Sequence, residues 1–120
     1  MSKQILIIED DLDILDGLAM LLELDGYTVI RAENGQQAID YLRVASALPC
    51  LILLDLMMPV KNGYEFRREQ QLDPVLAHIP VVVMSADVTA EGRAMRMGSK
   101  LFLKKPAEID AILEAAEAWC

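Results

Sequence analysis

Short apolar runs alternate with longer amphipathic segments along the chain, and this alternation constrains the fold more than any other feature of the sequence. The runs expected to form strands cover residues 4–8, 28–30, 51–54, 81–84 and 101–103, and the segments expected to form helices cover residues 12–24, 35–45, 64–72, 90–97 and 108–119. Strands and helices in strict alternation predict a parallel sheet with helices on both faces. Uninterrupted apolar runs, such as the one over residues 81–84, are typical of strands that are buried on both sides.

Turn-forming residues stand where this pattern needs them. Asp25-Gly26 is expected to end the first helix, Asn62-Gly63 to open the third, and Gly98 to end the fourth. The chain has 120 residues, which is the size of one domain, and we expect a single domain over residues 1–120.

Charge and composition exclude several classes of function. The formal net charge is -8, and no basic run is longer than a pair, so direct binding to nucleic acid has no electrostatic basis. No apolar run reaches the roughly 20 residues of a membrane-spanning helix, and the N-terminus does not resemble a secretion signal. We therefore expect a cytoplasmic protein that does not interact with membranes.

The two cysteines, Cys50 and Cys120, are far apart in the sequence and have neither the spacing nor the neighbouring histidines of a zinc site. We expect them to be two unpaired thiols.

Polar residues follow four of the five expected strands. Glu9-Asp10 follows the first, Asp55 the third, Ser85 the fourth, and Lys105 lies just after the fifth. In open parallel α/β sheets the ligand site lies beyond the carboxyl ends of the strands. Since an acid beside a buried strand is costly to desolvate unless it is paired or bound to a cation, these residues are candidates for a functional site.

The chemistry of this set favours a magnesium-dependent reaction at a carboxylate. Glu9, Asp10 and Asp55 offer the oxygen ligands that Mg²⁺ prefers, and Mn²⁺ is a possible substitute. A carboxylate can also accept a phosphoryl group as a nucleophile, which requires neutralisation of charge. Three carboxylates, one Mg²⁺ and Lys105 sum to zero, so charge counting predicts that phosphorylation of Asp55 depends on the metal.

Two members of the set also have ordinary structural interpretations. Ser85 could donate a hydrogen bond to a phosphoryl oxygen or could simply cap a turn. Lys105 precedes Pro106, which favours an extended backbone and could hold the side chain over the site. A solvated lysine before a turn is the alternative.

Several short motifs occur in an order and spacing that together are highly specific. They are Glu9-Asp10, Leu53-Leu54-Asp55-Leu56-Met57-Met58-Pro59, Asn62-Gly63, Val83-Met84-Ser85-Ala86, Gly98 and Lys105-Pro106. Across its whole length the chain thereby resembles the receiver domain of two-component response regulators, in particular the single-domain, chemotaxis-regulator-like kind. The resemblance implies a three-layer αβα sandwich, a flavodoxin-like (βα)5 fold with a five-stranded parallel sheet of order 2-1-3-4-5.

The resemblance also implies the roles of the site residues. Asp55 would be the phosphoacceptor, and its donor would be a phosphohistidine of a sensor histidine kinase or a histidine phosphotransfer protein. Glu9, Asp10 and Asp55 would bind Mg²⁺ together with the backbone carbonyl of Met57. Ser85 would follow the phosphoryl group and Lys105 would pair with it.

Further implications concern the switch and the output surface. Phe102 matches the aromatic switch position, although an ordinary buried strand residue would pack inward in the same way. The peptide bond between Lys105 and Pro106 is similar to one that is usually cis. A downstream protein would bind the face formed by the fourth helix, the fifth strand and the fifth helix. The chain departs from the commonest pattern at Ala107, where a Phe is frequent, and at Ser85, where Thr is more usual.

Under this interpretation the chain is a phosphorylation-activated switch and not an enzyme, since it would catalyse only its own phosphorylation and dephosphorylation. It could stand alone or be the receiver portion of a longer transcription regulator. One rival is a small Mg²⁺-dependent aspartyl-phosphate phosphatase, but haloacid-dehalogenase-like enzymes usually place a second Asp where Met57 stands. A flavodoxin-like cofactor carrier is the other rival, and Glu9-Asp10 would repel a flavin phosphate.

Overall fold

The computed structural model describes residues 3–120 and contains one parallel sheet of five strands in the order β2-β1-β3-β4-β5. The strands are β1 (Gln4–Ile8), β2 (Thr28–Ala32), β3 (Leu51–Asp55), β4 (Val81–Ser85) and β5 (Phe102–Lys104). This confirms the predicted α/β class and the strand order 2-1-3-4-5. The observed β5 is displaced by one residue from the expected run, because its last pairing is between Lys104 and Ser85 of β4.

Residues 3–120 also form five α-helices and two short 3-10 helices, of which all but the last helix lie between strands. They are α1 (Leu12–Leu24), α2 (Gly35–Val44), α3 (Gly63–Leu72), η1 (Leu76–His78), η2 (Val88–Ala90), α4 (Glu91–Arg96) and α5 (Ile109–Trp119). The fourth helix is shorter than expected because its start is the separate 3-10 turn η2, which the side chain of Asp87 caps by accepting from the Thr89 N–H. Within residues 3–120, none of the helices has the length and apolar character needed to cross a membrane.

Capping side chains fix where the helices next to the strand ends begin. Asp11 accepts hydrogen bonds from the backbone N–H groups of Asp13 and Ile14 at the start of α1. Asn62 and Glu65 form a reciprocal capping box at the start of α3. These caps hold the loops after β1 and β3 in place, and those loops carry the candidate site.

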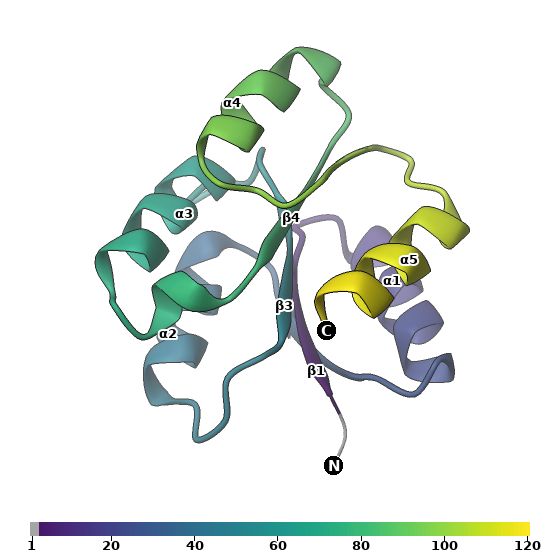
Figure 1. Ribbon diagram of the computed structural model, residues 1–120, viewed down its shortest axis with the longest axis horizontal. Helices are drawn as coiled ribbons and strands as arrows, with labels where there is room; N and C mark the ends of the chain where they lie inside the picture. Colours follow the sequence, from purple (N-terminus) through teal and green to yellow (C-terminus); the bar gives the residue numbers. More distant parts are fainter. Residues whose placement is uncertain (1–2) are drawn as a thin grey trace.

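The helices form one layer on each face of the sheet (Figure 1), which gives the predicted three-layer sandwich. Alternate side chains of each strand enter opposite cores. In β1, Leu6 and Ile8 pack with α2, α3 and α4, while Ile5 and Ile7 pack with α1 and α5. All four side chains are fully buried. The sheet is therefore a rigid, two-sided support for the residues at its carboxyl edge.

The expectation of two unpaired thiols is wrong, because the structure pairs Cys50 and Cys120 in a disulfide with a Cα–Cα distance of 5.0 Å. Cys50 immediately precedes β3, and Cys120 immediately follows α5. The two residues are 70 positions apart, so no local pattern marks them as partners. They meet because α5 packs on the sheet with its last turn beside the start of β3.

Candidate functional site

Strand register brings the predicted polar residues to one edge of the sheet. Asp55 and Ser85 are the last residues of β3 and β4, while Glu9 and Lys105 each follow the last residue of their strand. Ile8 of β1 pairs with Leu54 of β3. The residues that follow these two, Glu9 and Asp55, therefore lie beside each other at the carboxyl edge. The backbone N–H of Lys105 donates to the carbonyl of Ser85 over 2.8 Å, which ties the loop after β5 to the end of β4.

Three carboxylates meet at this edge. Each of Glu9, Asp10 and Asp55 places a carboxylate oxygen within 4.8 Å of the others. Glu9 is fully buried and Asp55 is 5% exposed, whereas Asp10 is exposed. The group therefore has two desolvated acids at its base and one acid that faces solvent.

Lys105 is the cation of the site. Its Nζ donates to Glu9 Oε1 and lies 3.4 Å from Asp55 Oδ2. The Lys105–Pro106 peptide bond is cis. One ammonium thus contacts both buried carboxylates, and it does so from the loop that follows β5.

The charge balance of the site favours the binding of a divalent cation. Burial raises the pKa of Glu9 to about 7, and the neighbouring Asp55 acts in the same direction, while the bond from Lys105 opposes both. For Lys105, burial alone would lower the pKa, but Glu9 and Asp55 outweigh it and the pKa is raised. Three carboxylates and one ammonium leave an excess of negative charge, and the all-oxygen donor set suits Mg²⁺ or Mn²⁺. The residues present therefore fit the metal.

Ser85 lies at the same edge and also acts as a turn residue. Its side chain is 2% exposed, and its Oγ accepts from the Asp87 N–H over 3.1 Å. The capping interpretation and the phosphate-binding interpretation are therefore compatible, because the cap leaves the hydroxyl hydrogen available as a donor.

Met57 and Phe102 are less closely tied to the site. Met57 follows β3 in the loop before α3, with its side chain 72% exposed. Phe102 is half-buried in β5 and packs against the core beneath α2, α3 and α4. Inward packing agrees with both interpretations of Phe102, so its role as a switch stays a prediction.

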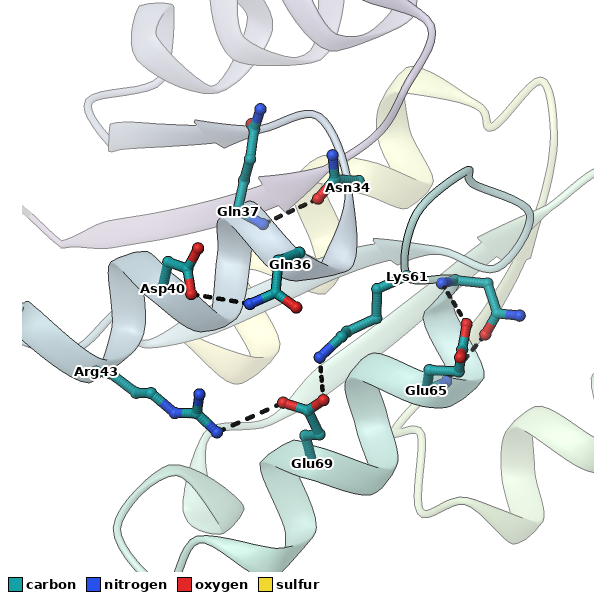
Figure 2. Close-up of polar contacts among 9 residues, drawn as sticks. Asn34, Gln36, Gln37, Asp40, Arg43, Lys61, Glu65 and Glu69 are labelled. Carbon is teal, nitrogen blue, oxygen red and sulfur yellow. Dashed lines mark hydrogen bonds and ion pairs between the residues drawn. The ribbon is translucent and has the colours of Figure 1, made fainter.

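The loop between β3 and α3 is held by residues that the sequence patterns did not single out (Figure 2). The Nζ of Lys61 bonds to Glu69 of α3, and Glu69 also pairs with Arg43 of α2 at 3.5 Å. The backbone of Gly63 lies against the end of β3, where a Cβ would stand 2.6 Å from the carbonyl oxygen of Asp55. From the sequence, the Asn62-Gly63 pair predicts a turn, but it does not predict that Gly63 contacts the end of β3.

An apolar cavity of 530 Å³ opens beside the site, between α1 and α5. Ile14, Leu18 and Ile112 line it, together with Ala107 and with Lys105, which contacts the carboxylates. The small side chain of Ala107 contributes to this space, which a Phe at that position would reduce.

Comparison with known proteins identifies the class. The family model described as the response regulator receiver domain matches residues 5–117, so the chain belongs to the receiver domains of two-component response regulators. These domains are signalling switches rather than true enzymes. A solved relative is the phosphorylated cyanobacterial phytochrome response regulator RcpA, with a TM-score of 0.83, 27% identity, and coverage of 98% of this chain and 91% of that one.

Two curated relatives show the range of architectures. The polar-differentiation response regulator DivK of Brucella anthropi is 31% identical over 121 residues, which cover 99% of this chain and 97% of DivK. The phosphate regulon transcriptional regulatory protein PhoB of Pseudomonas aeruginosa is 33% identical over 107 residues, which cover 88% of this chain. The match spans about half of PhoB, 46% of its length.

Proposed function

We propose that this chain is a phosphorylation-activated switch in which Asp55 accepts a phosphoryl group from a phosphohistidine of a sensor histidine kinase or a histidine phosphotransfer protein. The observation that carries this proposal is the contact of Lys105 Nζ with both Glu9 and Asp55, which sets one cation against two buried acids. A carboxylate so placed can act as a nucleophile while the ammonium offsets the charge that arrives with the phosphoryl group.

In the proposed transfer, an oxygen of Asp55 attacks the phosphorus in line, the phosphorus–nitrogen bond to the donor histidine breaks, and the departing imidazole nitrogen keeps the electron pair and takes a proton. Lys105 neutralises the added charge. Ser85 donates its hydroxyl hydrogen to a phosphoryl oxygen. When bound by Glu9, Asp10, Asp55 and the Met57 carbonyl, Mg²⁺ would supply further neutralisation of the phosphoryl oxygens.

The phosphoryl group would then shift a two-state surface. Ser85 turns toward the phosphate, Phe102 is held in the inward position that it already occupies, and the face of α4, β5 and α5 changes its affinity for a downstream protein. A shift from 1:99 to 99:1 requires about 5.5 kcal/mol of differential binding. A few charge-assisted hydrogen bonds in a partly desolvated site can supply a difference of this order.

The first test is intact-mass measurement after incubation with Mg²⁺ and a small phosphodonor such as phosphoramidate. Wild type gains one phosphoryl group, and Asp55→Asn gains none. Asp13→Asn is the matched control, because Asp13 is an exposed acid in the first turn of α1. Equal labelling of wild type and Asp55→Asn would contradict the proposal that Asp55 accepts the phosphoryl group.

The rival function is a Mg²⁺-dependent phosphatase. Under our proposal the chain catalyses only the formation and hydrolysis of its own aspartyl phosphate, so it shows no repeated turnover on p-nitrophenyl phosphate. Sustained release of p-nitrophenol would favour the phosphatase.

The setting of the switch is also part of the proposal. We expect it to work in the cytoplasm without direct contact with nucleic acid or membrane. It acts either as a stand-alone domain over residues 1–120 or as the receiver portion of a longer transcription regulator. DivK and PhoB illustrate these two arrangements.

A further inference from the structure

The groove between α3 and α4 gathers positive charge in a protein whose net charge is -8. The two helices are neighbours on the same side of the sheet (Figure 1). A small cavity of 160 Å³ lies between them, lined by Tyr64, Arg67, Arg68, Gln71, Arg93 and Met97. Three of its six lining residues are arginines.

Arg67 forms the base of this cavity and is only 8% exposed. Its Nε donates to the carbonyl of Met97 over 2.9 Å, and its Nη1 donates to Gln70 Oε1 over 2.8 Å. Its Nη2 makes no hydrogen bond among residues 3–120 and, since it is not one of the fully buried unpaired atoms, it still reaches solvent. Burial lowers the pKa of this guanidinium. Arg67 is thus a largely buried cation whose protein partners are neutral and whose Nη2 is open to a further acceptor.

Helix α3 separates its charges onto two sides. Glu65 and Glu69 lie on one side, where Glu69 contacts Lys61 and Arg43 (Figure 2). The side facing α4 carries Tyr64, Arg67, Arg68 and Gln71, which follow the spacing i, i+3, i+4 and i+7 of a single helix face. The acids of α3 are therefore turned away from its arginines.

Helix α4 adds a third cation, and its acid, Glu91, is not among the residues that line the cavity. The guanidinium of Arg93 stacks over the Tyr64 ring, 3.7 Å from its centroid. Within residues 3–120, the ion pairs involve Arg31, Arg43, Lys61 and Lys105, and none reaches the arginines of this groove. Like charges that share a small cavity repel one another, and an added anion relieves that repulsion.

We propose that the α3–α4 groove is a docking surface for an acidic segment of a partner protein. One carboxylate bonds to Arg67 Nη2 at the base, and Arg68 and Arg93 at the rim bind the acids beside it. The groove attracts an acidic segment because its charges are opposite in sign. The rest of the surface is acidic overall and repels such a segment, so binding is directed to the groove. The cavity is smaller than the roughly 300–1,000 Å³ of small-molecule sites, and it suits a single carboxylate. This groove is separate from Asp55 but shares α4 with the face that we propose to switch, so its binding is tested on the unphosphorylated protein.

The test is fluorescence anisotropy with a labelled oligoglutamate peptide at low ionic strength. Arg68→Ala and Arg93→Ala each weaken binding about fivefold, and the double variant weakens it further, as expected for charge-assisted pairs at a rim. Arg43→Ala is the matched control, because it removes the same charge from an arginine that is paired with Glu69. Its affinity for the peptide stays within about twofold of wild type.

Arg67 is tested by Arg67→Met, which keeps an apolar stem and removes the guanidinium, with circular dichroism to verify folding. A folded Arg67→Met protein binds the peptide more weakly than wild type does. Three outcomes would overturn the proposal: no peptide binding by wild type, equal weakening by Arg43→Ala and Arg68→Ala, or displacement of the peptide by an equal concentration of inorganic phosphate. The last result would instead identify a site for small anions.

Discussion

At the scale of single residues, the chemistry of the site depends on how burial and charge act on each side chain. Glu9 and Asp10 are adjacent in sequence, yet Glu9 is fully buried while Asp10 is exposed. The sequence predicted both acids as metal ligands, with Asp10 the more direct one, but could not predict which of them is buried, because exposure depends on which residue the end of β1 turns inward. The distinction matters because burial is the main reason that the pKa of Glu9 is raised to about 7.

This pKa predicts a pH-dependent affinity for Mg²⁺. Without metal, the folded-state pKa of Glu9 lies above its ordinary value of 4.5, so its contribution to stability is greatest at low pH and is lost as pH rises through about 7. Since the metal binds the carboxylate form, its affinity increases about tenfold between about pH 6 and pH 8, with release of a proton. Calorimetry in two buffers of different ionisation enthalpy measures both effects.

Glu9→Gln removes this pH dependence, whereas the exposed control Glu117→Gln keeps it. A Mg²⁺ affinity that is equally pH-dependent in Glu9→Gln would show that another group titrates.

At the scale of elements, close packing of α3 against β3 sets the position of Asp55, the proposed phosphoacceptor. A Cβ on Gly63 would lie 2.6 Å from the Asp55 carbonyl oxygen and 2.8 Å from Leu56 Cα, both of which are backbone atoms. Neither can move without displacing the end of β3. The glycine therefore fixes the approach of helix to strand, a role that the turn pattern alone does not reveal.

We expect Gly63→Ala to lower the free energy of unfolding by about 1–3 kcal/mol and to slow the labelling of Asp55 by phosphoramidate, because overpacking shifts the strand end. Gly17→Ala is the control, since a Cβ there meets nothing within 4 Å and should stabilise α1 by up to about 1 kcal/mol. Urea unfolding and intact-mass kinetics measure the two effects. Labelling of Gly63→Ala at the wild-type rate would show that the site tolerates this shift.

At the scale of the whole molecule, one covalent link joins the end of α5 to the start of β3. The Cys50–Cys120 bond closes a loop across 70 positions of sequence. In the chain-entropy account, a cross-link that closes a loop of this length raises the free energy of the unfolded state by about 4 kcal/mol. Lys3 Nζ also donates to the Cys120 carbonyl over 3.0 Å, so the residues just before β1 and β3 both contact the end of the chain. These contacts lie at the edge of the sheet opposite the one that carries Asp55.

We therefore expect reduction by dithiothreitol to lower the free energy of unfolding by up to about 4 kcal/mol. The double variant Cys50→Ser, Cys120→Ser should show the lower value with or without reductant. Urea unfolding monitored through Trp119 measures the difference. Identical unfolding curves for oxidised and reduced wild type would contradict a stabilising role for the link.

The sequence by itself determined the α/β class, the approximate bounds of most elements and the family, because apolar periodicity, turn residues and short motifs are local properties of the chain. It also placed Glu9, Asp55, Ser85 and Lys105 at strand ends, since parallel strands share one carboxyl edge. Only the tertiary structure decided which acid is buried, that Gly63 touches Asp55, that the cysteines pair, and that three arginines share a groove. Each of these depends on distances between residues that are separate along the chain, and packing alone sets those distances.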